Sequence, residues 1–373
     1  MVSMNVRIII KRALTQFDCP AIVHKVMQLR IIRNLKGLER ESGFMLRVFK
    51  KKWVWTASAL SLALAVILTG CGQSNTGGAK NESSPSAPAS ASADVRTVTH
   101  SMGTTDIEGT PTRVVVLTNE GTEALLALGA KPVGAVKSWT GDPWYKHIAA
   151  DMEGVTVVGE ESQPNIELIA SLKPDLIIGN KLRQEKVYDQ LKAIAPTVFS
   201  ETLRGEWQAN FLLYAEALGK DEEGEKIIAG YDSRTADFKA KAGDKLNEKV
   251  SVVRFMAGKT RIYLQDTFTG IAFSKLGITR PDNQKYSDTF VEEITKERLP
   301  EVDADRLFYF TYETGDGKAT QMEEEMLKDP LWQSLSVVKN NKAIRVDDAI
   351  WNTAGGVIAA NLMLDELYKI YEI

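Results

Sequence analysis

The sequence predicts an α/β protein of two units, each a largely parallel sheet with helices on both faces, joined by one long helix. Short β-branched runs alternate with segments of helical period from Arg113 onward, and the alternation begins again at Val250. Strands that alternate with helices favour a parallel sheet, because each helix carries the chain back between parallel neighbours. The stretch 221–246 between the units is rich in charged residues and predicts a solvated helix.

The first unit, 94–219, is expected to hold strands and helices in alternation. Strands are expected at 114–117, 133–136, 155–159, 176–178 and 197–199. Helices are expected at 122–130, 166–172, 183–192 and 207–218. Gly129 and Pro174 mark two of the helix ends, because glycine and proline interrupt regular helix.

The second unit, 248–373, repeats the pattern. Strands are expected at 251–253, 261–264, 306–310 and 343–346, with helices near 269–277, 288–299, 321–328 and 356–371. In the connecting helix, 220–247, Ile227, Tyr231 and Phe238 form one narrow apolar stripe. Such a helix is a stiff connector, so we expect the two units to close by only a small angle.

Composition excludes several classes of protein. Of 373 residues, 44% are hydrophobic and 25% charged, which excludes a disordered chain and a polytopic membrane protein. The two Cys and three His are too few for a disulfide framework or a zinc ribbon. Residues 1–70 hold 12 Lys/Arg and 3 Asp/Glu, which leaves 34 basic and 46 acidic residues in 71–373. A body this acidic is not expected to bind nucleic acid.

The N-terminal region has the pattern of a secretory signal. Arg47 and three lysines at 50–52 precede sixteen uncharged residues, 53–68, which end in the sequence Leu-Thr-Gly-Cys at 68–71. As a helix these sixteen residues would rise about 24 Å, less than the roughly 30 Å hydrocarbon core of a bilayer. The ending resembles the lipobox of bacterial lipoproteins, which implies that Cys71 is lipidated and becomes the first mature residue.

Two further segments flank this signal. Met45 is the expected start of the signal peptide, 45–70, and residues 1–44 are then an upstream extension from a misplaced start; the alternative is a long basic leader. After Cys71, the rest of the segment 71–93 lacks aromatic and β-branched apolar residues, so it cannot bury enough surface to fold. It is expected to be a tether with a reach of roughly 25 Å.

The two units echo each other in their acidic residues. Glu167 precedes Asp175 by eight positions, and Glu297 precedes Asp305 by the same number. Each Glu follows a good helix N-cap, Asn165 or Thr295, and so falls in a first helical turn. Residues alone leave two interpretations: the acids complement a helix dipole, or they form a two-point contact with basic residues of a partner.

Arginine and aromatic residues cluster after the expected strands, where doubly wound sheets bind their ligands. The candidate ligand-binding residues are Trp139, Arg183, Arg204, Arg254, Arg261, Tyr263, Arg280, Tyr312, Trp351 and Asn352. The planar fork of arginine suits oxygen anions, because it donates two parallel hydrogen bonds. For Trp144 and Trp207, which also follow strands, core packing is an equal alternative, and Arg280 could simply face solvent.

Three segments, 113–136, 163–179 and 295–310, resemble the binding proteins of bacterial iron-siderophore ABC importers, a family that includes ferrichrome, ferric-citrate and cobalamin binders. The resemblance covers about 110–373. It implies two Rossmann-like lobes on a rigid helix, with a ferric siderophore in the cleft between them. It also implies a lipid-anchored monomer at the outer face of the cytoplasmic membrane, with no cofactor and no protein ligand to the iron.

The resemblance assigns a role to the matched acids as well. The family's two docking glutamates, which pair with arginines of the dimeric permease driven by a cytoplasmic ATPase, fall on Glu167 and Glu297. Alternatives within the same fold are cobalamin or haem, with Tyr263 or Tyr312 as a haem ligand. An extracellular enzyme is the alternative from another class, but the sequence has no nucleophile elbow, P-loop or dinucleotide fingerprint after a strand.

Overall fold

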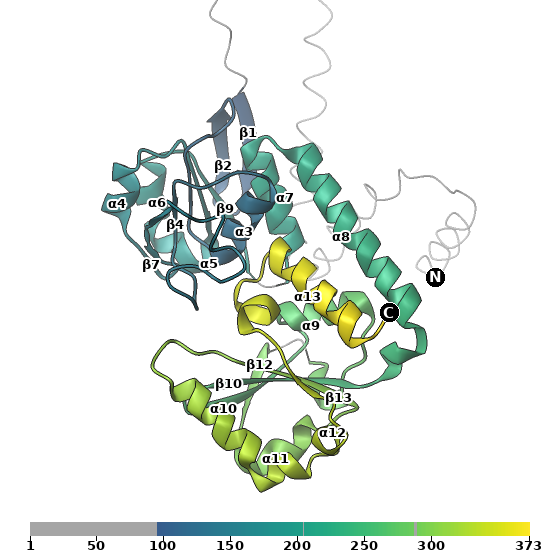
Figure 1. The fold of residues 1–373 in the computed structure, drawn as a ribbon. Helices are drawn as coiled ribbons and strands as arrows, with labels where there is room; N and C mark the ends of the chain where they lie inside the picture. The colour runs from purple at the N-terminus through teal and green to yellow at the C-terminus, as the bar shows by residue number, and fades with distance from the viewer. Residues whose placement is uncertain (1–94, 204, 287–288) are drawn as a thin grey trace, which may run out of the picture. The chain divides into compact units, whose positions relative to one another are not determined.

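The computed structural model describes residues 95–203, 205–286 and 289–373 (Figure 1). Contacts group these ranges within the unit Pro88–Ile373. The expected upstream extension 1–44, the signal sequence, Cys71 and the whole tether lie outside the described residues, and so does Arg204. Among the helices that are described, none combines the length and the apolar character needed to span a bilayer.

Five parallel strands form the sheet of the N-terminal half, in the order β5-β4-β3-β8-β9. They are β3 (Val114–Val116), β4 (Gly134–Ala135), β5 (Thr156–Val157), β8 (Leu176–Asn180) and β9 (Thr197–Ser200). β3 and β8 are buried along their whole length, which is why they form apolar runs in the sequence. The parallel sheet expected here is confirmed.

Helices cover this sheet largely as expected. They are α3 (Asn119–Ala127), α4 (Ile166–Ser171), α5 (Lys181–Gln184), η4 (Glu185–Val187), α6 (Tyr188–Lys192) and α7 (Trp207–Leu218). The side chain of Asn165 accepts a hydrogen bond from the Leu168 amide (3.0 Å), so it caps α4 as the sequence indicates. The single helix expected over 183–192 is instead α5, η4 and α6 in succession.

Two hairpins of this half were not expected. β1 (Val95–His100) pairs with β2 (Gly103–Glu108), and β6 (Gly159–Glu160) pairs with β7 (Gln163–Pro164). The first hairpin lies against β9, because the Ser101 amide and the Thr105 hydroxyl donate to carbonyls of Phe199 and Thr197, each at 3.0 Å. The core of the half therefore includes residues that precede the first expected strand.

The sheet of the C-terminal half has the order β12-β11-β10-β13-β14. Its strands are β10 (Val250–Met256), β11 (Lys259–Tyr263), β12 (Val291–Ile294), β13 (Arg306–Thr311) and β14 (Ala343–Arg345). β10, β13 and β14 pair in parallel, whereas β11 pairs antiparallel with both of its neighbours, β10 and β12. The two-residue turn between β10 and β11 explains the reversal: Gly258 has φ +71°, which a tight hairpin requires.

The remaining elements of this half are mostly helical. They are α9 (Phe268–Leu276), η6 (Asp282–Gln284), η7 (Lys296–Val302), α10 (Lys318–Lys328), α11 (Pro330–Ser334), α12 (Ser336–Lys339), the π-helix η8 (Ala349–Thr353) and α13 (Val357–Ile370). The helix expected near 288–299 is wrong: β12 and then the 3₁₀-helix η7 occupy that stretch. Pro300 lies inside η7, and proline disfavours a regular α-helix there.

One long helix, α8 (Asp221–Ala242), followed by η5 (Gly243–Asn247), connects the halves (Figure 1). Tyr231 and Phe238 are buried on its expected stripe. The helix contacts α7 of the first half and α9 and α13 of the second. Phe238 packs edge-on against Tyr368 of α13, with ring centroids 5.3 Å apart. These contacts on both sides hold the helix as a stiff connector.

A buried carboxylate adds a direct link between the halves. Glu123 of α3 accepts a hydrogen bond from the Ala359 amide in the first turn of α13 (2.9 Å). Its other oxygen lies 2.6 Å from Nε2 of His147. An acidic group at a helix N-terminus is favourable, because the unpaired amides there carry positive partial charge.

The two aspartates at matching positions in the halves, Asp175 and Asp305, have a structural role. Asp175, just before β8, accepts hydrogen bonds from the Thr112 and Arg113 amides that lead into β3 (2.8 and 2.9 Å). Asp305, just before β13, accepts one from the Lys249 amide that leads into β10 (2.7 Å). In both halves the aspartate thus joins the starts of two neighbouring parallel strands.

Candidate functional site

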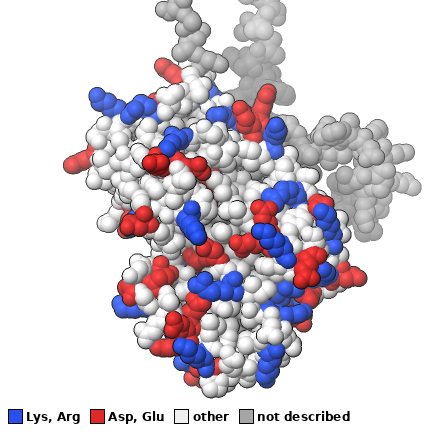
Figure 2. Space-filling model, in the orientation of Figure 1, with Lys and Arg blue, Asp and Glu red and all other residues white. Residues whose placement is uncertain are grey.

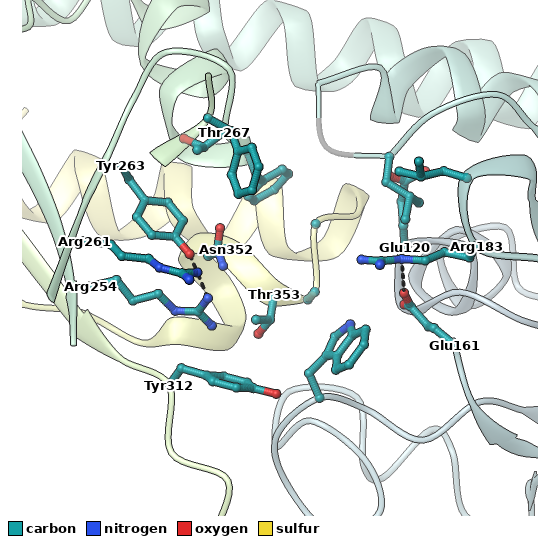
Figure 3. Close-up of a pocket in the computed structure, with 17 residues that line it drawn as sticks. Glu120, Glu161, Arg183, Arg254, Arg261, Tyr263, Thr267, Tyr312, Asn352 and Thr353 are labelled. Carbon is teal, nitrogen blue, oxygen red and sulfur yellow. Dashed lines mark hydrogen bonds and ion pairs between the residues drawn. The ribbon is translucent and has the colours of Figure 1, made fainter. Parts of the chain in front are cut away.

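A cavity of about 340 Å³ is lined by residues from both halves of the chain (Figure 3). Its charged side chains are Glu120, Glu161 and Arg183 from the N-terminal half, and Arg254 and Arg261 from the C-terminal half. Figure 3 places the first three on one side and Arg254 and Arg261, with Tyr263 and Tyr312, on the other. On the face drawn in Figure 2, by contrast, basic and acidic side chains are interspersed.

Most of the residues expected from strand ends meet in this cavity. Those that line it are Trp139, Arg183, Arg254, Arg261, Tyr263, Tyr312 and Asn352. In the N-terminal half Trp139 and Arg183 follow β4 and β8, as the strand-end rule predicts. In the C-terminal half Tyr312 follows β13, but Arg254 lies within β10, and Arg261 and Tyr263 lie within the antiparallel strand β11. Contact of these residues with a ligand stays a prediction.

Arg254, in β10, is held rigidly. Its Nε and Nη2 donate to the two carboxylate oxygens of Asp348 at 2.6 and 2.9 Å, and its Nη1 donates to the Tyr263 hydroxyl at 2.7 Å. The guanidinium also lies over the Tyr312 ring, 4.5 Å from its centroid. Burial acts to lower the pKa of Arg254, but Asp348 and Tyr263 together outweigh burial and raise this pKa above its ordinary value.

Arg261 is bound more loosely than Arg254. It lies on β11 and donates to Oε1 of Glu293 on β12 at 2.7 Å. The side chain of Glu293 is 49% exposed, so water screens this ion pair. Arg261 can therefore exchange its partner for an incoming anion at little cost.

Arg183, in α5, faces Arg261 from the other half. Its Nε lies 3.4 Å from Oε2 of Glu161, and its guanidinium lies 5.7 Å from the centroid of the Trp139 ring. Glu161 is buried and accepts hydrogen bonds from the Asn119 amide and side chain at 2.7 and 2.8 Å. Burial raises the pKa of Glu161, while Asn119 and Arg183 oppose that rise.

Two of the expected residues do not line the cavity. Trp351 is fully buried between the rings of Phe273 and Phe308, and its indole nitrogen donates to Glu366. Trp144 and Trp207 are core residues as well, so for these two the alternative of core packing is confirmed. Proximity to a strand end does not distinguish an aromatic ring that packs inward from one that faces the cavity.

Arg280 is the other expected residue outside the lining. Its side chain is buried, neither in the cavity nor facing solvent, and donates to the Tyr263 carbonyl and to Oε1 of Gln284. Burial lowers the pKa of Arg280 to about 9. Arg280 thus supports the backbone behind Tyr263 rather than lining the cavity itself.

Several lining residues were not expected. Glu120 lies in the first turn of α3, the helix that follows β3, and could have been found by the same strand-end rule. Glu161 lies in the turn between β6 and β7, a hairpin that the sequence did not reveal. Thr267 and Phe268 begin α9, and Thr353 ends η8. Within the described ranges, His, Cys, Asp and Glu nowhere gather in a group of three or more that could hold a metal ion.

The sequence matches the family model described as periplasmic binding protein over residues 114–350. The chain belongs to the periplasmic binding protein family. The family and fold class expected from the sequence are thus confirmed. Members of this family bind substrates rather than convert them, which agrees with a cavity that joins two halves of one chain.

Relatives of this periplasmic binding protein include two from Bacillus subtilis. It is 51% identical over 314 residues to the probable siderophore-binding lipoprotein YfiY, an alignment that covers 82% of this chain and 94% of YfiY. It is 32% identical over 332 residues to the Fe(3+)-citrate-binding protein YfmC, with 87% of this chain and 99% of YfmC covered. The crystal structure of Staphylococcus aureus SirA complexed with staphyloferrin B matches with a TM-score of 0.68 at 37% identity, covering 74% of this chain and 98% of SirA.

Replacing Asp348 by Asn is expected to destabilise the fold by about 3–5 kcal/mol, because it leaves the buried Arg254 guanidinium without its counter-charge. Urea unfolding followed by tryptophan fluorescence measures the loss. The matched control is Glu293→Gln, which removes the exposed partner of Arg261 and should change stability little. Equal losses in the two variants would contradict the rigid role given to the Arg254–Asp348 pair.

Proposed function

We propose that this periplasmic binding protein captures a ferric siderophore in the cavity and delivers it to the permease of an ABC importer. The observation that carries the proposal is the meeting of three arginines and several aromatic rings, from both halves, in one cavity of an acidic protein. Ferric siderophores present carboxylate, hydroxamate or catecholate oxygens, which suit guanidinium donors. The siderophore, ferric citrate and staphyloferrin B bound by YfiY, YfmC and SirA, as their descriptions give them, support the same class of ligand.

The three arginines have different roles in this proposal. Arg183 and Arg261 contact the chelate, because their side chains are 37% and 21% exposed. The carboxylate of Glu161 lies 3.4 Å from Arg183, and the side chain of Glu293, the partner of Arg261, is 49% exposed. Arg254 has three of its donors occupied and positions Tyr263 and Tyr312. Arg204, which follows β9 in the sequence, joins the ligand-contacting group as an expectation from its position alone.

The siderophore supplies the coordination sphere of the iron, and the protein holds the outer surface of the complex. Each charge-assisted hydrogen bond to a shielded oxygen contributes about 1.5–3 kcal/mol. Two such bonds contribute about 3–6 kcal/mol, which corresponds to dissociation constants from millimolar to tens of micromolar, and aromatic contacts from Trp139 and Tyr312 strengthen binding further.

Location and partners complete the proposal. The lipid on Cys71 and the tether up to residue 93 would keep the binding domain at the outer face of the cytoplasmic membrane. Glu167 and Glu297, both exposed and in the first turns of α4 and η7, would pair with arginines of the two permease subunits. Exposed ion pairs are individually weak, so the two contacts would set orientation more than affinity.

The ligand-contacting arginines can be tested by titration. We expect Arg183→Gln and Arg261→Gln each to weaken binding of the best ferric chelate about tenfold or more, because each removes a charge-assisted contact. The panel contains ferric citrate, ferric staphyloferrin B and a ferric trihydroxamate, and quenching of tryptophan fluorescence reports binding. The control is Arg234→Gln on α8, an arginine of the same 37% side-chain exposure that also pairs with a carboxylate.

Two results would contradict the proposal. If the unmodified protein bound none of the ferric chelates, the function itself would be wrong. If it bound one of them and both variants bound it as tightly as Arg234→Gln, the assignment of Arg183 and Arg261 would be wrong.

The permease contacts can be tested separately from ligand binding. The double variant Glu167→Lys/Glu297→Lys is expected to lose most chelate-dependent iron uptake in cells, because the reversed charges repel the permease arginines. Its affinity for the chelate should not change. Glu153→Lys/Glu324→Lys, one exposed glutamate in each half, is the control and should transport normally. Normal uptake by the first double variant would remove Glu167 and Glu297 from the interface.

A further inference from the structure

Part of the cavity wall is apolar, and the contacts proposed above do not use it. Four lining residues form this apolar wall: Leu182, Leu203, Phe268 and Phe290. The first two come from the N-terminal half and the last two from the C-terminal half. An iron complex that offered only oxygen anions would make no apolar contact with this wall.

Two members of the apolar wall are unusually exposed. Leu182 is 59% exposed and Phe290 37% exposed. Only six large hydrophobic side chains reach that level of exposure in the part of the chain that is described, and two of the six line this one cavity. Exposed apolar residues that gather at a cavity mark a binding surface, whereas scattered ones are ordinary.

The fold brings the apolar wall together from four separate segments. Leu182 lies in α5, beside Arg183, and Phe268 begins α9. The Phe290 carbonyl accepts a hydrogen bond from the Leu264 amide (2.9 Å), which places Phe290 next to the end of β11 and the start of α9. Gly205 packs closely against α9, since a Cβ atom on Gly205 would come within 2.1 Å of the Ile271 side chain. Leu203 lies two residues before Gly205 and is therefore near α9 as well.

The cavity therefore has two chemical parts. Arg254, Arg261, Tyr263 and Tyr312 lie together on the side of the second sheet (Figure 3). Arg183 is the arginine on the opposite side, beside Glu120 and Glu161, and its chain neighbour Leu182 begins the apolar wall. A ligand that satisfies both parts is anionic at one end and apolar at the other.

We infer that the cavity selects ferric chelates with a hydrocarbon or aromatic arm, and that Leu182 and Phe290 contact this arm. The inference rests on the proposed function, since it names the class of chelate that the same cavity takes. Burial of each methylene against these side chains strengthens binding by up to about fourfold. Because the wall is partly open to solvent, we expect a smaller gain for each methylene of a real arm.

A matched pair of synthetic chelates tests the inference. Both are ferric complexes of a citrate dihydroxamate, one with acetyl and one with hexanoyl groups on its hydroxamates, so the charge and the iron-binding atoms are identical. The unmodified protein is expected to bind the hexanoyl chelate about tenfold or more tightly than the acetyl chelate. In Leu182→Ser this preference should fall to about threefold or less. Leu331→Ser, at another exposed leucine that lies in α11 and does not line the cavity, should keep it.

The outcomes separate this inference from the proposed function. Equal affinity of the unmodified protein for both chelates would overturn the inference and leave siderophore capture standing. An equal loss of affinity for both chelates in Leu182→Ser would also overturn it, because the apolar wall would then serve contact between the halves. Failure to bind either chelate, or any member of the panel above, would overturn the proposed function and the inference together.

Discussion

The ion pair between Arg254 and Asp348 determines much of the geometry of the cavity. Asp348 directly precedes η8, and it accepts a hydrogen bond from Thr353 at the end of that helix (3.0 Å). Arg254 lies in the middle of the sheet, between β11, which carries Tyr263, and β13, which leads to Tyr312. Two charges can be buried together only when their hydrogen bonds are satisfied, so this pair ties η8 to the sheet in one arrangement.

Carboxylates pair with all three arginines of the cavity, and Glu120 adds a fourth acidic side chain. Arg183, Arg254 and Arg261 each have a carboxylate partner, in Glu161, Asp348 and Glu293. The partners differ in burial, since Glu161 and Asp348 are buried and Glu293 is half in solvent. A simple anion gains little by displacing a carboxylate that is already present. A large chelate gains more, because it meets several arginines and rings at once and covers them from water.

Much of the fold could be predicted from the sequence because its signals are local. Buried parallel strands such as β3 and β8 form apolar runs, and the stripe of Tyr231 and Phe238 identifies α8. Where the prediction was wrong, the deciding interaction is tertiary. β12 is a strand because β11 pairs with it, and β11 reverses direction because of the turn at Gly258.

The same difference between local signals and tertiary interactions applies to the residues of the candidate site. Arg183, Arg254 and Arg261 could be predicted to line the cavity, because the residue type and the approximate positions of the strands are visible in the sequence; that Arg254 and Arg261 lie within β10 and β11 was not. Trp351 and Arg280 lie outside the lining because the direction of a side chain depends on packing against Phe273, Phe308 or Gln284. Leu182 and Phe290 could not be recognised, since an exposed apolar residue in a sequence looks like any core residue.

The position of the iron in a crystal of the complex tests siderophore capture in the cavity most directly. Anomalous scattering at the iron edge locates the metal. The chelate used is the member of the panel that binds most tightly. We expect one iron peak in the cavity, with ligand oxygens within hydrogen-bond distance of Arg183 and Arg261 and with no protein atom bound to the metal. An iron peak outside the cavity, or one coordinated by a protein side chain, would contradict this expectation.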